Sequence, residues 1–384
     1  MMSFFLIVLA VSVVVPAGAF IFLKGVNWKE AGCILLANIV IAGSSAGIVS
    51  CSAKHDVEIL NGRVTSKTRD VVSCRHSYSC NCRQECSGSG KNRSCSQVCD
   101  TCYEHSFDVD WDVASTVGGF SIDTIDRQGL REPPRWTSTR VGEPVSVTHS
   151  YENYVKASPG TLFRHQGLTE KYATTLPNNP QNIYDYWHLN RLVTVGISVD
   201  DPRGWNAALE ELNAELGAPK QANIIVVLVK DQPQDWYYAL EQKWIGGKKN
   251  DVVLVVGVDG DLKPQWATVM CWTTNEIFKV KLRDDVMNDP VLTKDAVIAD
   301  LKTNVSQYFV RKPMADFQYL ESEMTPSTTA WVVTLIIALI VSIGLTVFFE
   351  LEDPFEEGDE DDFGYAPKRR RNRYGYGTSG SGPY

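Results

Sequence analysis

The densest group of oxygen-bearing side chains in the sequence is a short acidic segment near residue 285. It contains Asp284, Asp285 and Asp289, with Asn288 next to the last of them. Ca²⁺ binds carboxylate and carbonyl oxygens, but it needs about six of them, several from one loop. The order D-D-x-x-N-D matches no established cation loop. We therefore interpret these acids as solvated loop residues and retain Asp284, Asp285 and Asp289 as the candidate metal ligands.

Eight cysteines form a second group that could do chemistry. An even number of cysteines among small polar residues is typical of a loop-rich module that disulfides stabilise in place of an apolar core. We expect disulfides among Cys51, Cys74, Cys80, Cys82, Cys86, Cys95, Cys99 and Cys102. Their number leaves the connectivity open.

Zinc is the alternative for this cysteine-rich segment. Cys99-x-x-Cys102, with His76 and His105 nearby, could supply thiolate and imidazole ligands. Zinc ribbons normally use two C-x-x-C pairs, and the sequence has one. We therefore favour disulfides, and we predict no cofactor beyond a possible calcium or zinc ion.

Two further motifs suggest phosphate chemistry only weakly. Asp108–Asp112 resembles the D-x-D start of aspartate-nucleophile phosphatases, but that motif should end an apolar strand, and Glu104–Phe107 is polar. We predict an alternating edge strand with solvated carboxylates. Gly246–Lys249 lacks the order of a P-loop, which favours an exposed basic loop. No residue can be assigned a catalytic role.

Three uncharged apolar runs must position these groups relative to a membrane. Phe4–Leu23, Ala31–Val49 and Ala330–Phe349 are each long enough to cross a hydrocarbon core about 30 Å thick. We therefore predict three transmembrane helices. Ala17-Gly18-Ala19 resembles a signal-peptidase site, so cleavage of residues 1–19 is an open alternative.

The positive-inside rule orients these spans. Lys24 and Lys29 lie in the first short loop, and the tail contains the densest basic run. Both belong in the cytoplasm by this rule, which places residues 51–329 in a periplasmic, lumenal or extracellular space and residues 350–384 in the cytoplasm.

The tail is too polar and Gly-rich to fold alone. Its basic residues could bind anionic lipid at ~1 kcal/mol each, and nucleic acid would attract them for the same reason. We prefer a solvated tail and do not expect nucleic acid as a partner. The residues are Lys368, Arg369, Arg370, Arg371 and Arg373.

The segment between the second and third apolar runs divides by composition. We predict a cysteine-rich module at 51–130, an irregular or β-rich connector at 131–190, an α/β domain at 191–311 and a stalk at 312–329. The connector is either strands and turns packed on a neighbour or an extended linker.

Strands and helices alternate in the α/β domain, which predicts a layered fold. Apolar strands are expected at 192–199, 223–230 and 251–258, followed by an antiparallel strand at 266–272. Helices are expected from Pro202 to a stop at Gly217, from Pro233 to Trp244, and over 294–309.

At these residues the chain resembles the TPM domain family, whose members are typically exported and tethered by a hydrophobic helix. The resemblance rests on Ile224–Val229, Gln234–Trp244, Ile245–Asp251 and Val252–Val258. It covers about residues 191–311 and implies an outward-facing α/β domain. Some members have been proposed to be phosphatases or to bind calcium. The sequence departs from the family at Cys271–Glu276, which lacks the family's Gly-rich turn.

Cys99–Asp112, followed by Ile125–Trp136, also looks similar to uncharacterised membrane proteins of tailed bacteriophages, which carry no assigned role. We expect a membrane-anchored binding or assembly protein whose partners are the lipid bilayer and a protein contacted by the outer domain. The alternative is a metal-dependent phosphatase-like hydrolase or a calcium-binding domain.

Overall fold

The computed structural model describes residues 6–8, 10, 14, 17–18, 28–88, 94–163, 165, 167–324 and 326–352. The chain divides into two compact units. The larger runs from Ala46 to Ser327, and the smaller contains the segments that flank it in sequence.

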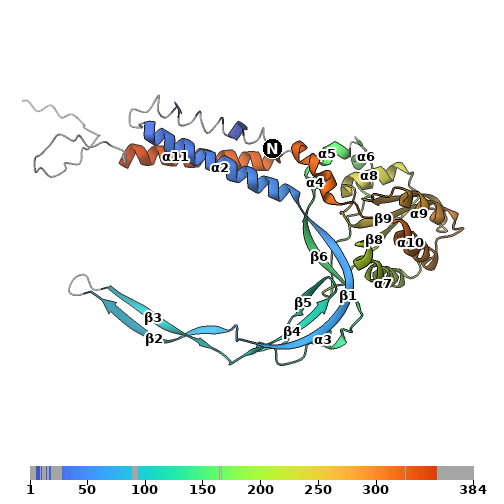
Figure 1. The fold of residues 1–384 in the computed structure, drawn as a ribbon, viewed down its shortest axis with the longest axis horizontal. Helices are drawn as coiled ribbons and strands as arrows, with labels where there is room; N and C mark the ends of the chain where they lie inside the picture. The colour runs from blue at the N-terminus through green and yellow to red at the C-terminus, as the bar shows by residue number, and fades with distance from the viewer. Residues whose placement is uncertain are drawn as a thin grey trace, which may run out of the picture. The chain divides into compact units, whose positions relative to one another are not determined.

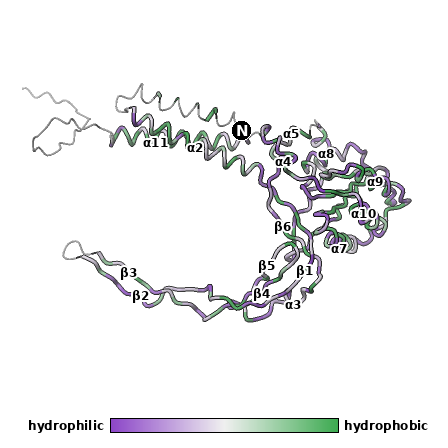
Figure 2. Tube along the Cα trace, in the orientation of Figure 1, coloured by the Kyte–Doolittle hydropathy of each residue, from purple (hydrophilic) through white to green (hydrophobic). Residues whose placement is uncertain are grey.

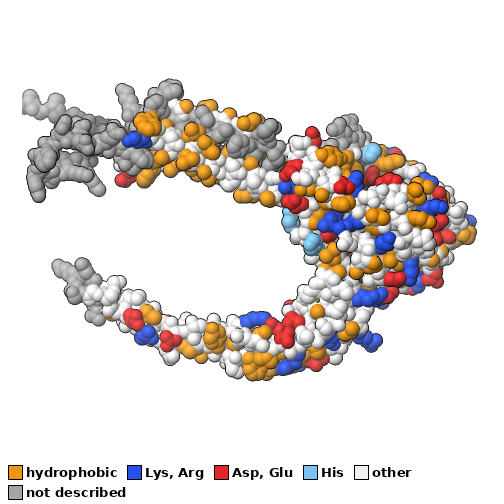
Figure 3. All heavy atoms as spheres, viewed as in Figure 1, with side chains coloured by type: hydrophobic (Ala, Val, Ile, Leu, Met, Phe, Trp, Pro, Cys, Tyr) orange, Lys and Arg blue, Asp and Glu red, His pale blue; other side chains and the backbone are white. Residues whose placement is uncertain are grey.

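Two helices, α2 (Trp28–Lys54) and α11 (Thr328–Glu352), are long and apolar enough to cross a membrane. Hydrophobic residues follow both helices (Figure 2), whereas charged side chains are spread over the larger unit (Figure 3). The helices contain the predicted spans Ala31–Val49 and Ala330–Phe349. The remaining predicted span, Phe4–Leu23, lies largely outside the described residues and stays a prediction.

A polar contact joins α2 to α11. The side-chain amide of Asn38 donates to Ser342 Oγ at 2.8 Å and to the carbonyl oxygen of Ile34 at 2.9 Å. Small side chains let helices approach closely, and a hydrogen bond between them adds stability where water is absent. The buried small or polar residues of the two helices are Glu30, Asn38, Ala42, Thr334, Ala338 and Ser342.

The first sheet of the larger unit is antiparallel and has strand order β5-β4-β1-β6 (Figure 1). The first half of β1 pairs with β6, and its second half pairs with β4. The strands are β1 (His55–Val72), β4 (Asp108–Ser115), β5 (Gly118–Ile122) and β6 (Pro144–Glu152).

β4 is therefore an interior strand, and the prediction of an edge strand at Asp108–Asp112 is wrong. Val109, Trp111 and Val113 alternate into the core of this sheet. Asp108 is 5% exposed, so its carboxylate is not solvated. The sequence showed that apolar residues alternate in β4, but it could not show that a strand pairs with β4 on each side.

The six disulfide-bonded cysteines lie on a separate two-stranded ribbon, β2 (Ser77–Ser87) with β3 (Ser94–Tyr103). Every side chain of these strands is exposed or half-buried. The cysteine-rich module is thus an extended ribbon and not a loop-rich one, and it is shorter than the predicted 51–130, whose remainder belongs to the first sheet.

The connector at 131–190 consists of a strand and short helices packed on neighbours, the first of the two predicted alternatives. β6 pairs with β1, and Trp187 is 1% exposed in the core of the first sheet. The helices are α3 (Pro134–Ser138), α4 (Tyr154–Ala157), α5 (Pro159–Leu162) and α6 (Leu168–Lys171).

The predicted α/β domain is present, with strand order β10-β9-β8-β7. β7, β8 and β9 are parallel and β10 is antiparallel, as predicted for the strand at 266–272. The strands are β7 (Leu192–Val195), β8 (Asn223–Lys230), β9 (Asp251–Val258) and β10 (Pro264–Cys271).

Helices cover both faces of this second sheet, which explains why Ile224–Val229 of β8 and Val252–Val258 of β9 carry no polar side chain. The cluster on one face contains residues of α7 (Pro202–Lys220), α9 (Ile277–Asn288) and α10 (Lys294–Tyr308). The cluster on the other contains residues of α8 (Asp235–Trp244) (Figure 1). The helix start at Pro202 was predicted correctly, and the Asp201 side chain caps it by accepting the backbone N–H of Gly204.

Two features of the domain differ from the prediction. α7 continues to Lys220 instead of stopping at Gly217, where a β-carbon would lie 2.3 Å from the carbonyl oxygen of Asn61. Gly217 therefore allows α7 to approach β1 closely. α9 was not predicted. Beyond the domain, the predicted stalk forms the 3₁₀ helix η2 (Met314–Glu323), which packs on α4.

Candidate functional site

The loop Gly246–Asn250 joins α8 to β9 and docks on β1. Lys248 Nζ lies 2.6 Å from Asp56 Oδ1, and Lys249 Nζ lies 2.9 Å from Glu58 Oε1. The Lys248 and Lys249 side chains are only 16% and 15% exposed. The prediction of an exposed basic loop is therefore wrong, because two buried acids of the other sheet neutralise it.

Local sequence explains this docking. Asp56 and Glu58 are two residues apart on β1, so their side chains share one face of the strand. Gly246 and Gly247 adopt positive φ angles of 72° and 79°, which suit glycine and turn the loop toward that face.

Glu58 lies at a cavity of about 510 Å³ between the first sheet and α7. It is 1% exposed, and its Oε1 lies 2.9 Å from His149 Nδ1 as well as from Lys249 Nζ. Its Oε2 has no hydrogen-bond partner in the part of the chain that the structure describes, and Arg311 Nη1 is 3.9 Å away. Asn61 and Gln221 add polar groups to the lining.

The surroundings of the loop keep the Asp56 carboxylate charged and the Tyr151 phenol neutral. Burial alone would raise the pKa of Asp56, but hydrogen bonds from Lys248 and Asn153 outweigh it and lower the pKa. Burial raises the pKa of Tyr151, whose hydroxyl donates to Asp56 Oδ2 at 3.1 Å. Asp56 is therefore ionised and Tyr151 protonated at neutral pH.

The cavity has the chemistry of an anion-binding site. Among the described residues that line it, one is acidic, whereas His149, Lys249 and Arg311 carry or can carry positive charge. A ligand carboxylate or phosphate could bind these cations beside Glu58. The described lining includes no thiol and no hydroxyl paired with a base.

A buried polar network next to the cavity holds the two sheets together. Arg191 is fully buried, and its Nη2 donates to Asn61 Oδ1 and Ser146 Oγ, both at 2.6 Å. Burial lowers the pKa of Arg191 to about 10, so the guanidinium stays charged at neutral pH. Asn223 bonds both Asn61 and Asp251 and extends the network to the second sheet.

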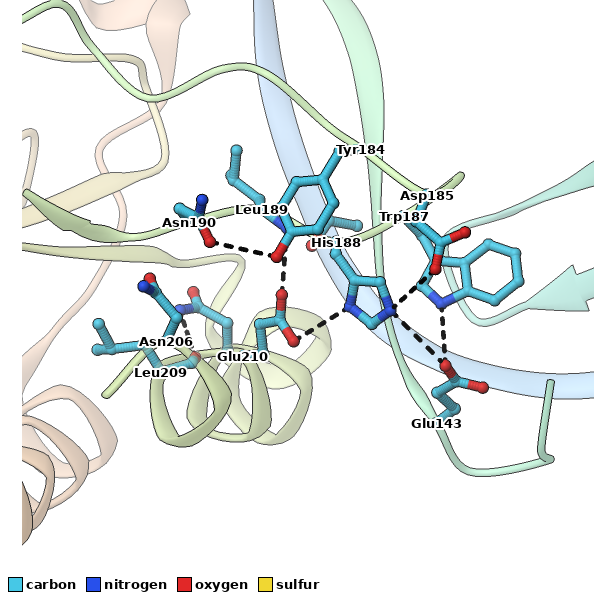
Figure 4. A network of polar contacts seen from close by, with 12 residues as sticks. Glu143, Tyr184, Asp185, Trp187, His188, Leu189, Asn190, Asn206, Leu209 and Glu210 are labelled. Carbon is cyan, nitrogen blue, oxygen red and sulfur yellow. Dashed lines mark hydrogen bonds and ion pairs between the residues drawn. The ribbon is translucent and has the colours of Figure 1, made fainter. Parts of the chain in front are cut away.

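His188 forms a separate acidic network, shown in Figure 4. Its Nδ1 lies 3.2 Å from Glu210 Oε2, and its Nε2 lies 3.8 Å from Glu143 and 3.9 Å from Asp185. The hydrogen bond with Glu210 is the main cause of a raised pKa for His188. Glu210 is on α7, so this histidine links the connector to the α/β domain.

The candidate metal ligands lie on α9 and at its end, not in a loop. Asp284 pairs with the adjacent Arg283, and Asp285 accepts from Asn304 Nδ2 at 2.8 Å. Asp289 is near Asp285, since their charges interact and contribute to a raised pKa of Asp289 after burial. The structure thus groups Asp285 and Asp289, whereas Asp284 has its own partner.

Six of the eight predicted disulfide cysteines are paired. The bridges are Cys80–Cys102, Cys82–Cys99 and Cys86–Cys95. The prediction is wrong for Cys51 and Cys74, which are free thiols. Cys51 lies in the last turns of α2 and Cys74 follows β1, so neither belongs to the ribbon where paired strands bring cysteines together.

The zinc alternative at Cys99-x-x-Cys102 is excluded in this structure, because both thiols belong to disulfides. Lys368, Arg369, Arg370, Arg371 and Arg373 lie outside the described residues, so lipid binding by the tail stays a prediction.

Sequence reasoning missed Glu58, His149 and Arg311. Two acids within an otherwise apolar start of a strand, Asp56 and Glu58, were the available signal, because buried acids require cationic partners.

Comparison of the chain with protein-family models, curated proteins and solved structures found no significant match to any of them.

Proposed function

We propose that the chain is a membrane-anchored binding and assembly protein that presents its larger unit to a protein partner outside the cytoplasm. The observation that carries this proposal is the ribbon of β2 and β3. Among the described residues its strands pair only with each other and bury none of their side chains, although three disulfides stiffen them. A rigid arm that adds nothing to its own chain's core is suited to contact with another molecule.

The location follows from the same cross-links. Disulfides persist in oxidising compartments, and α2 and α11 bound the larger unit in sequence. We infer that residues 51–329 are periplasmic, lumenal or extracellular and that residues 350–384 are cytoplasmic. We also propose that residues 191–311 belong with the TPM family, supported by the order β8, α8, Gly-rich loop and β9.

Site-specific photo-crosslinking tests the binding proposal. A photoreactive residue would replace Gln84 or Gln97, which face each other on the ribbon, or Gln265 on β10 as a matched exposed control. In cells that produce the protein, we expect one discrete protein adduct from the two ribbon positions and none from the control. Equal adducts at all three positions, or none on the ribbon, would reject it.

The alternative function is calcium binding or metal-dependent phosphate-ester hydrolysis near Asp289. The observation that favours it is that Asp289 Oδ2 and Asp300 Oδ2 have no hydrogen-bond partner among the described residues. A calcium ion would supply a partner for these oxygens. The effect of calcium on the melting temperature distinguishes this alternative from the binding proposal.

A further inference from the structure

Three side chains converge where the ribbon joins the first sheet. Cys74 follows β1, and His105 and Asp108 flank the connection from β3 to β4. Cys74 Sγ lies 3.1 Å from His105 Nδ1, which lies 2.9 Å from Asp108 Oδ1. All three possible ligand atoms are within 4.8 Å of one another.

These contacts do not form a catalytic relay. In a nucleophile, histidine and carboxylate triad the two ring nitrogens serve different partners. Here the same nitrogen, Nδ1, faces both the sulfur and the carboxylate. The three atoms therefore point toward a common position and not along a chain of proton transfer.

The environment of the Asp108 carboxylate favours a cation at that common position. Its side chain is buried, and Oδ2 accepts the backbone N–H of Arg75 at 2.7 Å. Oδ1 makes a 2.9 Å ion-pair contact with His105 Nδ1 and otherwise has no hydrogen-bond partner among the described residues. A buried carboxylate oxygen with so few polar contacts is costly, and a cation would supply the missing interaction.

The neighbouring groups orient the other two atoms. The backbone N–H of His76 donates to Cys74 Sγ at 3.4 Å, and the same sulfur lies 3.5 Å from the carbonyl oxygen of His76, so these two contacts fix the position of the sulfur. Glu104 Oε2 lies 3.9 Å from His105 Nε2, and Arg127 fixes Glu104 through contacts of 2.6 and 2.7 Å. A carboxylate near the distal nitrogen is a frequent companion of histidine ligands in metal sites.

We propose that Cys74, His105 and Asp108 bind a Zn²⁺ ion. Thiolate, imidazole and carboxylate are its usual ligands, and a tetrahedral ion would hold sulfur and nitrogen ~3.5 Å apart and nitrogen and oxygen ~3.3 Å apart. The observed separations are a few tenths of an ångström shorter, which small side-chain rotations can supply. Three protein ligands leave one position for water or a partner's side chain.

A Zn²⁺ ion at this site would stabilise the base of the ribbon. It would join the segment after β1 to the segment before β4, so the two segments that connect the ribbon to the first sheet would be held together. Metal binding would also keep Cys74 reduced beside three disulfides, where a free thiolate could exchange with them. The site is distinct from the C-x-x-C zinc module considered from sequence, since Cys99 and Cys102 are both oxidised.

The test uses the full chain purified in detergent without chelators. We expect about one zinc per chain by elemental analysis, and replacement by Co²⁺ should give the visible bands of a tetrahedral ion and a thiolate-to-cobalt charge-transfer band. Cys74→Ser should abolish the charge-transfer band, and Asp108→Asn should lower Zn²⁺ affinity more than ~10–100-fold, the range for outer-shell changes such as Glu104→Gln.

Two matched controls make the result specific. Cys51→Ser removes the other free thiol near the ribbon's sequence, and His76→Gln removes the neighbouring imidazole; both should retain full metal content. Intact mass after alkylation checks that three disulfides remain in each variant. A wild-type protein without a thiolate-to-cobalt band, or with Cys74 in a disulfide, would overturn the proposal, as would metal content unaffected by both Cys74→Ser and Asp108→Asn.

Discussion

Glu58 shows how a single buried acid can organise a joint between two sheets. Its carboxylate lies among three basic side chains contributed by β6, by the Gly-rich loop and by the segment after α10. The same carboxylate both neutralises these groups and lines the cavity, so binding and stability depend on one residue.

Glu58→Gln should therefore destabilise the larger unit by roughly 3–5 kcal/mol, because it leaves Lys249 in a largely buried position without a counter-charge. Chemical denaturation followed by tryptophan fluorescence measures this. Glu152→Gln is the control: it removes an exposed partner of Lys54 and should cost less than about 1 kcal/mol. Equal effects of the two changes would show that Glu58 is not the organising charge.

His188 should make stability depend on pH. Its hydrogen bond with Glu210 raises its folded-state pKa above the ordinary value of 6.5, despite burial and the opposing charge of Arg135. The stabilisation is therefore complete below pH 6.5 and is lost as pH rises through the raised pKa. We expect His188→Gln to flatten this part of the profile of unfolding free energy, measured from pH 5 to 9. An unchanged slope would assign the dependence to other groups.

Helices α9 and α10 bring like-charged carboxylates close together. Burial, and then the charges of Asp289 and Asp285, raise the pKa of Asp300 to about 6 from an ordinary 3.8. Its contribution to stability is thus greatest below pH 3.8 and is lost as the pH rises through about 6.

Asp300→Asn should accordingly stabilise the chain at pH 7.5 by roughly 1 kcal/mol, a figure reduced for partial exposure, and the gain should vanish near pH 4. Thermal unfolding at the two pH values measures it. Asp284→Asn is the control, since Asp284 pairs with Arg283. A Ca²⁺-dependent rise in the melting temperature that Asp300→Asn abolishes would instead support the calcium-binding alternative.

Sequence predicted the elements whose burial is complete or strictly periodic. β8 and β9 were found because both faces are apolar, and α7 and α10 because their apolar residues recur at helical spacing. α9 was missed because only Phe278, Leu282 and Val286 face the core among charged neighbours. β1 was missed because its second half is polar, and its pairing with both β4 and β6 is a long-range property.

The candidate sites were less predictable because they too depend on contacts between residues that are distant in sequence. Cys80, Cys82 and Cys86 could be assigned to disulfides by composition, but Cys74 resembles them in sequence and differs only in its three-dimensional neighbours. His105 was noted as a possible ligand, yet the ribbon separates Cys74 in sequence from His105 and Asp108.

For the whole molecule, the decisive prediction is which side of the membrane the larger unit occupies. Ser66→Cys, at an exposed position of β1, and Ser381→Cys would be made separately in a Cys51→Ser background. In intact cells we expect an impermeant thiol reagent to label the first and not the second. Labelling of Ser381→Cys alone would reverse the orientation and remove the basis for a stable disulfide ribbon.

The unbroken length of β1 also has a mechanical meaning. Its 18 residues follow α2 directly, and the two halves of the strand are bonded along opposite edges, by β6 and then by β4. These hydrogen bonds run across the strand, so β1 could slide along its own axis only if many of them broke together. The pairing on both edges therefore fixes the register of β1 along its whole length.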